Sequence, residues 1–158
     1  MTWNSDNVVF SRSMIKSNAY RSLKRASLLI LNEFMSRRKM SKTTRSGRES
    51  WIIINNGEIE LPYRDLMNTF KISDRTVTRS IDELIDKGFI DIAEQGNGTG
   101  GGWRTKYWID DRWKRWGKPD FTIKKRKKAF RKLGFMKTEA TDNIAGSVPA
   151  RMSGDAKI

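Results

Sequence analysis

Apolar residues recur with helical spacing between residues 74 and 87. Four of them stand at positions i, i+4, i+7 and i+8, which share one face of a helix: Val77, Ile81, Leu84 and Ile85. Ser73 before the run is a residue type that caps helix N-termini, and Gly88 after it is typical of a helix end. The pattern predicts a short helix between these two residues with a buried apolar face.

The opposite face of this predicted helix changes sign along its length. Arg75 and Arg79 occupy the first two turns, whereas Asp82 and Asp86 occupy the last two. Only the first half of the helix therefore suits a phosphate group.

A second apolar stripe lies directly upstream of this helix. Pro62 suits a helix N-terminus, and the stripe follows it at Tyr63, Leu66, Met67 and Phe70. Only residues 71–73 separate the two helices. Two short helices with so tight a connection form a helix-turn-helix unit, in which the second helix is the one that enters a DNA major groove.

A predicted hairpin follows the two helices. Residues 89–92 and 103–109 have the composition of strands, and residues 94–102 between them contain five glycines. Strand, glycine loop and strand predict a β-hairpin. The second strand carries Arg104 and Lys106.

The order of these elements, with ISDRTVTRSIDELIDKGFI at its centre, resembles the winged helix-turn-helix family of DNA-binding domains over roughly residues 18–110. Within this family, the sequence most resembles small winged-helix proteins of bacterial, plasmid and phage mobile elements. The resemblance implies an α+β fold, a three-helix bundle with a helix-turn-helix and a β-hairpin wing. It also implies that residues 73–79 are the recognition helix and residues 96–106 the wing.

The rest of the chain completes a four-part organisation. The expected parts are a polar N-terminal arm at 1–17, the winged-helix domain at 18–117, a basic extension at 118–135 and a disordered tail at 136–158. The domain's first helix is expected over about residues 18–38, from the apolar spacing there. A short helical turn is expected after residue 109.

The region between the first two predicted helices is less regular. Residues 36–48 hold six basic residues and no acid, and are expected to form a loop that is either merely solvated or contacts phosphate. The apolar run 51–54 is expected to be buried. Residues 55–57, Asn-Asn-Gly, favour a turn, so that the run either pairs with residues 58–61 or leads directly into the second helix.

Composition points to a polyanionic partner. The chain has 32 Lys and Arg against 18 Asp and Glu, a net charge of +14. Eleven basic residues and one acid lie within residues 112–132, so that +10 of the charge is concentrated there.

Most catalytic chemistries lack their usual residues. The chain has no Cys and no His, which excludes disulfides, thiolate ligands and the commonest general base. Two acidic sets are candidate magnesium ligands, Asp82 with Glu83 and Asp86, and Asp110 with Asp111. The first set lies on the predicted solvent face of a helix, the second precedes a dense basic stretch, and neither has an identifiable second shell, so we expect no enzyme, metal site or cofactor.

The residues expected to bind DNA fall into four groups. Arginines early in a recognition helix can contact guanine through two hydrogen bonds, and a cation at a helix N-terminus or in a basic run suits phosphate. Threonine side chains suit phosphate or a thymine methyl, and strand cations suit a groove or the backbone. The candidates are Arg64, Ser73, Arg75, Thr76, Thr78, Arg79, Arg104, Lys106, Lys124, Lys125, Arg126, Lys127 and Lys128.

Several alternatives remain open at this point. Arg79 is four residues before Glu83 and suits an ion pair along the helix. The tryptophans at positions 103, 108, 113 and 116 suit either the core, which we favour, or stacking on single-stranded bases. The basic run suits any polyanion, so that an RNA-binding or protein-interaction winged helix is the alternative function.

The expected partner is double-stranded DNA. A homodimer and a monomer with a basic arm are equally compatible with the sequence, which shows no heptad run. The chain has no apolar segment of the kind found in signal peptides or membrane spans. We therefore expect no membrane partner and a location in the bacterial cytoplasm or nucleoid.

Overall fold

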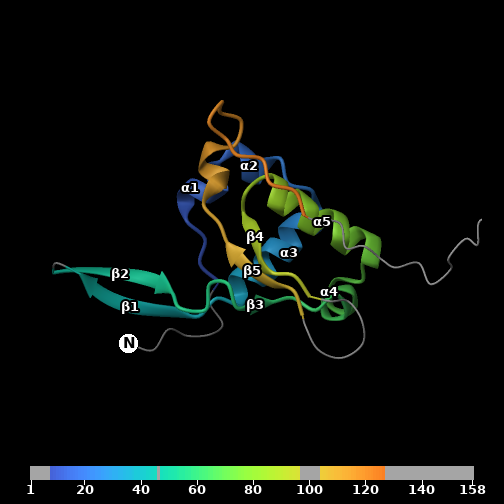
Figure 1. Cartoon of the computed structure of the whole chain (residues 1–158), viewed down its shortest axis with the longest axis horizontal. Helices are drawn as coiled ribbons and strands as arrows, with labels where there is room; N and C mark the ends of the chain where they lie inside the picture. Colours follow the sequence, from blue (N-terminus) through green and yellow to red (C-terminus); the bar gives the residue numbers. More distant parts are fainter. Residues whose placement is uncertain (1–7, 46, 97–103, 127–158) are drawn as a thin grey trace, which may run out of the picture. The chain divides into compact units, whose positions relative to one another are not determined.

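The computed structural model describes residues 8–45, 47–96 and 104–126 of the chain. These residues form a mixed α+β structure with two small antiparallel sheets (Figure 1). The glycine loop at 97–103 with Trp103, and the chain from residue 127 onward, lie outside the described residues. The elements are α1 (Arg12–Lys16), α2 (Asn18–Arg21), α3 (Arg25–Ser36), β1 (Met40–Arg45), β2 (Arg48–Ile53), β3 (Ile59–Glu60), α4 (Tyr63–Phe70), α5 (Asp74–Asp86), β4 (Ile90–Glu94), β5 (Lys106–Ile109) and the 3-10 helix η1 (Arg112–Arg115).

The two helices predicted around residues 71–73 are confirmed as α4 and α5. Ser73 caps α5, because its Oγ accepts a hydrogen bond from the Thr76 N–H at 3.2 Å. Lys71 adopts a left-handed conformation with φ 53°, which turns the chain between the helices. The four apolar residues predicted for the inner face of α5 are all buried: Val77, Ile81, Leu84 and Ile85.

The prediction of a single helix over residues 18–38 is wrong, because the chain forms two helices there. Helix α2 ends at Arg21 and α3 starts only at Arg25. Lys24 is extended, with φ −70° and ψ 155°, and its N–H donates to the Glu83 carboxylate rather than to a carbonyl one turn earlier. A bond to α5 therefore replaces a helical hydrogen bond at the break.

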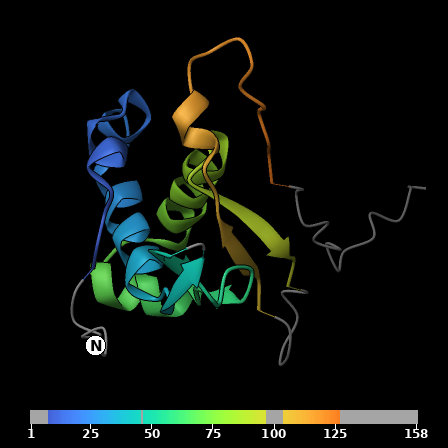
Figure 2. The same ribbon diagram turned by 90° about the vertical axis from the view of Figure 1, so that its left-hand side faces the viewer.

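The predicted strands at 89–92 and 103–109 are present as β4 and β5. They pair antiparallel, with Ile90 opposite Ile109, and β3 pairs on the other edge of β5 to give the order β3-β5-β4. Figure 2 shows β4 and β5 side by side, to one side of α3 and α5. The central strand thus faces the helices.

The prediction of a loop at residues 36–48 is wrong. Strand β1 lies within this range and pairs with β2 in a hairpin, with Met40 opposite Ile53. Gly47, with φ +73°, suits the turn between the strands. The Asn55–Gly57 turn then leads to β3 and on to α4, so the run 51–54 does not pair with residues 58–61.

The expected burial of the run 51–54 is also wrong. Trp51, Ile52 and Ile54 are 41%, 48% and 59% exposed. The β1–β2 hairpin extends away from the helices in Figure 1, which agrees with the partial exposure of these side chains.

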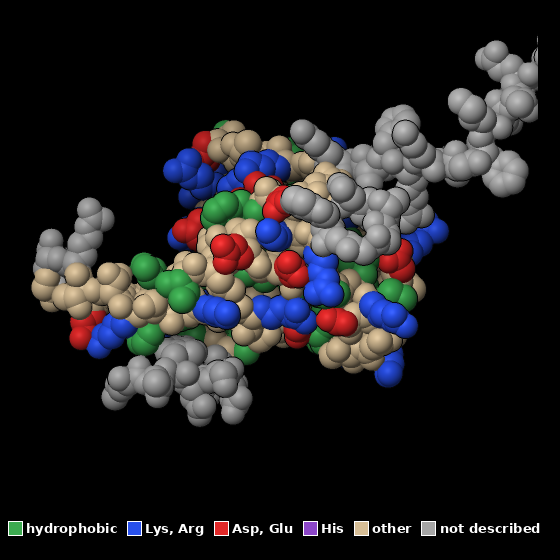
Figure 3. Space-filling model, turned by 60° about the horizontal axis from the view of Figure 1, so that its bottom comes forward, with side chains coloured by type: hydrophobic (Ala, Val, Ile, Leu, Met, Phe, Trp, Pro, Cys, Tyr) green, Lys and Arg blue, Asp and Glu red, His purple; other side chains and the backbone are tan. Residues whose placement is uncertain are grey.

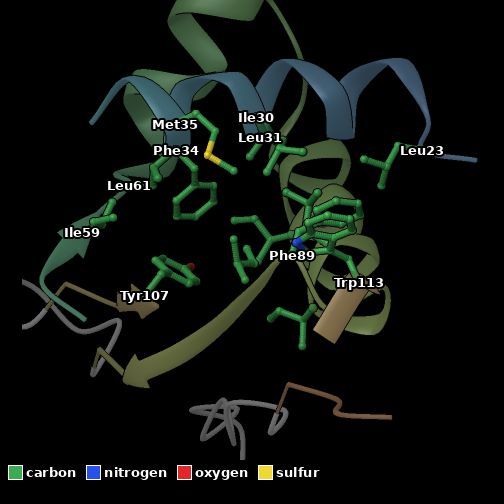
Figure 4. Packing of buried hydrophobic residues seen from close by; sticks show 14 of the residues in the cluster. Leu23, Ile30, Leu31, Phe34, Met35, Ile59, Leu61, Phe89, Tyr107 and Trp113 are labelled. Carbon is green, nitrogen blue, oxygen red and sulfur yellow. The ribbon is translucent and has the colours of Figure 1, made fainter. Parts of the chain in front are cut away.

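Aromatic side chains close the core between the helices and the β3-β5-β4 sheet. Phe34 of α3 and Tyr107 of β5 meet edge to face with ring centres 5.1 Å apart, and Figure 4 shows them pointing toward one another. Phe89 stacks on Trp113 of η1 at 6.1 Å. The expected core position is confirmed for Trp113, whereas Trp108 is 47% exposed.

Candidate nucleic-acid interface

The first turn of α5 is organised by two hydroxyl groups. Besides capping the helix, the Ser73 Oγ lies 2.9 Å from the Thr76 Oγ1, within hydrogen-bonding distance. Ser73 is exposed, and Thr76 and Thr78 are half-buried. The cap therefore fixes the direction in which the first turn of α5 presents its exposed side chains.

Arg75 and Arg79 are exposed on the N-terminal half of α5. Among the described residues neither has an ion-pair or hydrogen-bond partner. The pairing of Arg79 with Glu83 that the spacing allowed is not formed, because the Glu83 carboxylate binds Lys87 at 2.8 Å. Both guanidinium groups are therefore available to a ligand.

Arg64 lies in the first turn of α4 and is likewise exposed, with no partner in the described part of the chain. Its neighbour Tyr63 is joined to Asp82 of α5 by Arg126, which donates to the Tyr63 hydroxyl at 2.6 Å and pairs with Asp82 at 3.0 Å. The start of α4 thus lies beside the middle of α5, one turn beyond Arg79.

The cations predicted for the wing are compensated by acids. Lys106 pairs with Glu94 at 2.9 Å, and Arg104 pairs with Glu60 at 3.4 Å. The hydrogen bond and charge of Glu94 raise the pKa of Lys106 above its usual value. A phosphate group would have to displace these carboxylates before it could bind either cation.

The described part of the basic segment returns to the α5 and β4 surface. Lys124 pairs with Asp91, and the Arg126 side chain, only 22% exposed, lies against Tyr63 and Asp82. Lys125 is exposed and has no partner within residues 8–45, 47–96 and 104–126. Lys127 and Lys128 lie outside the described residues.

Arg126 compensates Asp82 in the acidic half of α5. Burial lowers the pKa of Arg126, but Tyr63 and Asp82 outweigh this effect, so that the pKa lies above its usual value. Figure 3 shows basic and acidic side chains interspersed over the face in view. Many charges on this molecule are thus compensated. Some described cations have no partner, Arg12 and Lys16 of α1 among them, and Arg64, Arg75 and Arg79 are those that lie on α4 and α5.

A half-buried hydrogen-bond network holds α5 against the preceding helices. The Glu83 carboxylate accepts hydrogen bonds from the Ser27 hydroxyl at 2.5 Å, from Lys87 at 2.8 Å and from the Lys24 N–H at 3.4 Å. Lys87 also donates to the Ser22 carbonyl at 2.7 Å. Burial alone would raise the pKa of Glu83, but these partners lower it below its usual value of 4.5.

Replacing Glu83 by Gln is therefore expected to lower the free energy of unfolding by about 1.5–3 kcal/mol at neutral pH, because hydrogen bonds to a charged group are lost. A carboxyl whose pKa is lower in the folded state contributes stability above its unfolded pKa, and this contribution is lost as pH falls through the folded value. The difference between wild type and variant in urea unfolding should thus shrink below pH 4.5. The exposed Glu58→Gln is the control, and an equal loss in both variants would contradict the network.

Most of the acidic residues considered as magnesium ligands form ion pairs with basic side chains instead. Asp110 pairs with Arg112 and Asp111 with Lys114, each at 2.5 Å. Burial raises the pKa of Asp110, but the hydrogen bonds from Arg112 and the Asp111 N–H outweigh this effect, so that the pKa lies below its usual value. No group of three or more acidic, His or Cys side chains within the described ranges could hold a metal ion.

Sequence reasoning missed the roles of Tyr63 and Arg112. Arg112 donates to the carbonyls of Ile85 and Thr122, at 3.2 and 2.9 Å, and so ties the end of α5 to the segment after η1. Both roles depend on contacts between residues far apart in the chain, for which the local sequence carries no signal.

Comparison with protein-family models, with curated proteins and with solved structures gives no match. In the part of the chain that the structure describes, no helix has both the length and the apolar character needed to cross a membrane. The functional assignment therefore rests on the geometry of α4 and α5.

Proposed function

We propose that the chain is a winged helix-turn-helix protein that binds double-stranded DNA with sequence preference. It would act as a transcriptional regulator or a replication-origin-binding protein of a bacterial or mobile-element system. The order of α3, α4, α5 and the paired strands β4 and β5 supports the winged-helix interpretation. The observation that carries the proposal is the pair of exposed, uncompensated arginines on the first two turns of α5.

In the proposed complex, the N-terminal half of α5 enters the major groove. Arg75 and Arg79 each read a guanine through its O6 and N7 atoms, and each good contact of this kind discriminates by about 1–3 kcal/mol. Arg64 contacts phosphate beside them, near the positive end of α4. The hydroxyl groups of Ser73 and Thr76 keep the first turn of α5 rigid and add contacts to phosphate or thymine.

The wing and the basic segment contribute less specific contacts in this proposal. Arg104 and Lys106 exchange their carboxylate partners for phosphate, so the net gain from each is small. Lys125 has no such partner to exchange. These cations strengthen binding to all sequences and steepen its salt dependence.

Selection from randomised double-stranded DNA at two salt concentrations tests the proposal, with single-stranded DNA and RNA as competitors. An enriched sequence that survives the higher salt is expected, because base contacts are less sensitive to salt than phosphate contacts. Binding that selects nothing and disappears at higher salt would contradict sequence reading.

The second candidate is a winged helix that binds RNA or protein, with the basic segment as a general polyanion contact. The concentration of +10 of the net charge within residues 112–132 favours it. Equal affinity for RNA and for double-stranded DNA in the same selection would identify this function instead.

A further inference from the structure

The β1–β2 hairpin carries the densest exposed apolar surface of the described residues. Trp51, Ile52 and Ile54 follow one another within four positions and are each at least 41% exposed. Val9 is also 48% exposed. It lies near the base of the hairpin, since its backbone carbonyl accepts a hydrogen bond from Arg38, two residues before β1. The surface therefore extends from the second strand to the base of the hairpin.

Both faces of the hairpin are apolar. The register places Trp51 opposite Lys42 on the face that also carries the Met40 and Ile53 pair, whereas Ile52 lies opposite Ser41 on the other face. A two-stranded hairpin is only marginally stable in water unless further strands or a helix cover it. Its outer edges also present backbone groups that can pair with another strand.

Charge identifies the partner that fits this surface. Between residues 40–44 and 49–53 the only charged side chains are Lys42 and Glu49, which pair with each other at 2.5 Å. These ten residues are thus neutral in a chain of net charge +14. The central part of the hairpin therefore adds no like-charge repulsion when two copies of a strongly basic protein approach, and it offers a polyanion little attraction. The strands end in Arg45 and Arg48, which lie opposite each other at the tip.

We propose that the β1–β2 hairpin is a self-association surface, on which two copies of this chain pair their hairpins antiparallel into a four-stranded sheet. The pairing is a closed two-fold contact. It separates the tips, which carry Arg45 and Arg48, because six residues of strand span about 20 Å. It also buries apolar side chains of both copies, and it does not depend on DNA.

The dimer is expected to be reversible. The edge that pairs is one strand of six residues in each copy, so the contact belongs to the class of small interfaces that bury less than about 1,200 Å² in total. The dissociation constant is therefore expected to be on the order of micromolar.

Sedimentation equilibrium over a range of protein concentrations, at a salt concentration that removes nucleic acid, tests this proposal. Wild type is expected to show a concentration-dependent monomer–dimer equilibrium. Ile52→Thr with Ile54→Thr keeps residues that favour strands but should weaken the dimer roughly tenfold or more. Ile15→Thr is the matched control, since Ile15 on α1 is 47% exposed. A monomer at all concentrations, or equal weakening by the control, would overturn the proposal.

Cross-linking gives a second test that does not depend on the folding of the isoleucine variants. Because the chain has no Cys, Ser50→Cys and Thr43→Cys each introduce a single thiol on β2 and β1, and Ser13→Cys introduces one on α1 as the control. With a short bismaleimide, a covalent dimer is expected from a hairpin thiol and not from Ser13→Cys. A dimer from neither hairpin thiol would overturn the proposal, whereas loss of DNA selection with intact cross-linking would contradict only the DNA-binding function.

Discussion

Replacement of both Arg75 and Arg79 by Ala is expected to remove the preference of the protein for its selected DNA sequence. Each guanidinium that pairs with a guanine contributes about 1–3 kcal/mol of discrimination, so the two together should change relative affinity by about 30-fold or more. Fluorescence anisotropy with the selected and a scrambled duplex measures the ratio of the two dissociation constants. This ratio should fall close to one in the double variant.

The control for this experiment is Arg12→Ala with Lys16→Ala. Both side chains are exposed on α1, and neither has a partner among the residues described. The control removes the same charge, and should lower affinity for both duplexes without changing their ratio. If the double variant of α5 retains its preference, the assignment of α5 as the reading helix is wrong. Because Arg75 and Arg79 are exposed, neither change should affect folding.

The helices α4 and α5 could be predicted because their signals are local. The Ser73 cap, the apolar spacing that begins at Val77 and the stop at Gly88 all lie within one short stretch. The paired strands β4 and β5 could be predicted for a similar reason, since short apolar runs stand on either side of a glycine-rich segment. Local rules therefore suffice where the pattern and the boundary residues agree.

The β1–β2 hairpin could not be predicted from the same rules. Its first strand is polar and basic, so that residues 40–45 carry no alternation of apolar and polar positions. The apolar run at 51–54 suggested a buried strand, and its exposure is visible only when the neighbouring elements are placed. A pattern of apolar residues indicates which residues need cover but does not say whether the same chain provides it.

The charges of the candidate site were the least predictable feature. Thirteen residues were expected to contact DNA on type and position alone, yet Lys124 and Arg126 meet acids 33 and 44 residues away. Such pairs depend on tertiary placement. The structure reduces the set of uncompensated cations expected at the site to Arg64, Arg75, Arg79 and Lys125, within the residues that it describes.

Replacement of Gly88 by Ala is expected to destabilise the fold by about 2–5 kcal/mol. Gly88 ends α5 with φ +78°, a conformation that costs about 1–2 kcal/mol for a residue with a Cβ. The added Cβ would also lie 2.5 Å from the Arg112 Cβ and 2.9 Å from the Trp113 nitrogen, and such overpacking adds about 1–3 kcal/mol. Neither neighbour can rotate away, because one is the root of a side chain and the other is backbone. Urea unfolding followed by circular dichroism measures the loss.

Gly117→Ala separates the two causes of this loss. Gly117 has a similar φ of +82°, but no heavy atom lies within 4 Å of the position that its Cβ would take. It should therefore lose only the conformational part, about 1–2 kcal/mol. A larger loss at Gly88 than at Gly117 would show that η1 packs tightly against the end of α5 and fixes that helix in the domain. Equal losses would mean that the end of α5 and η1 can move apart, and that contacts other than this one hold the helix in place.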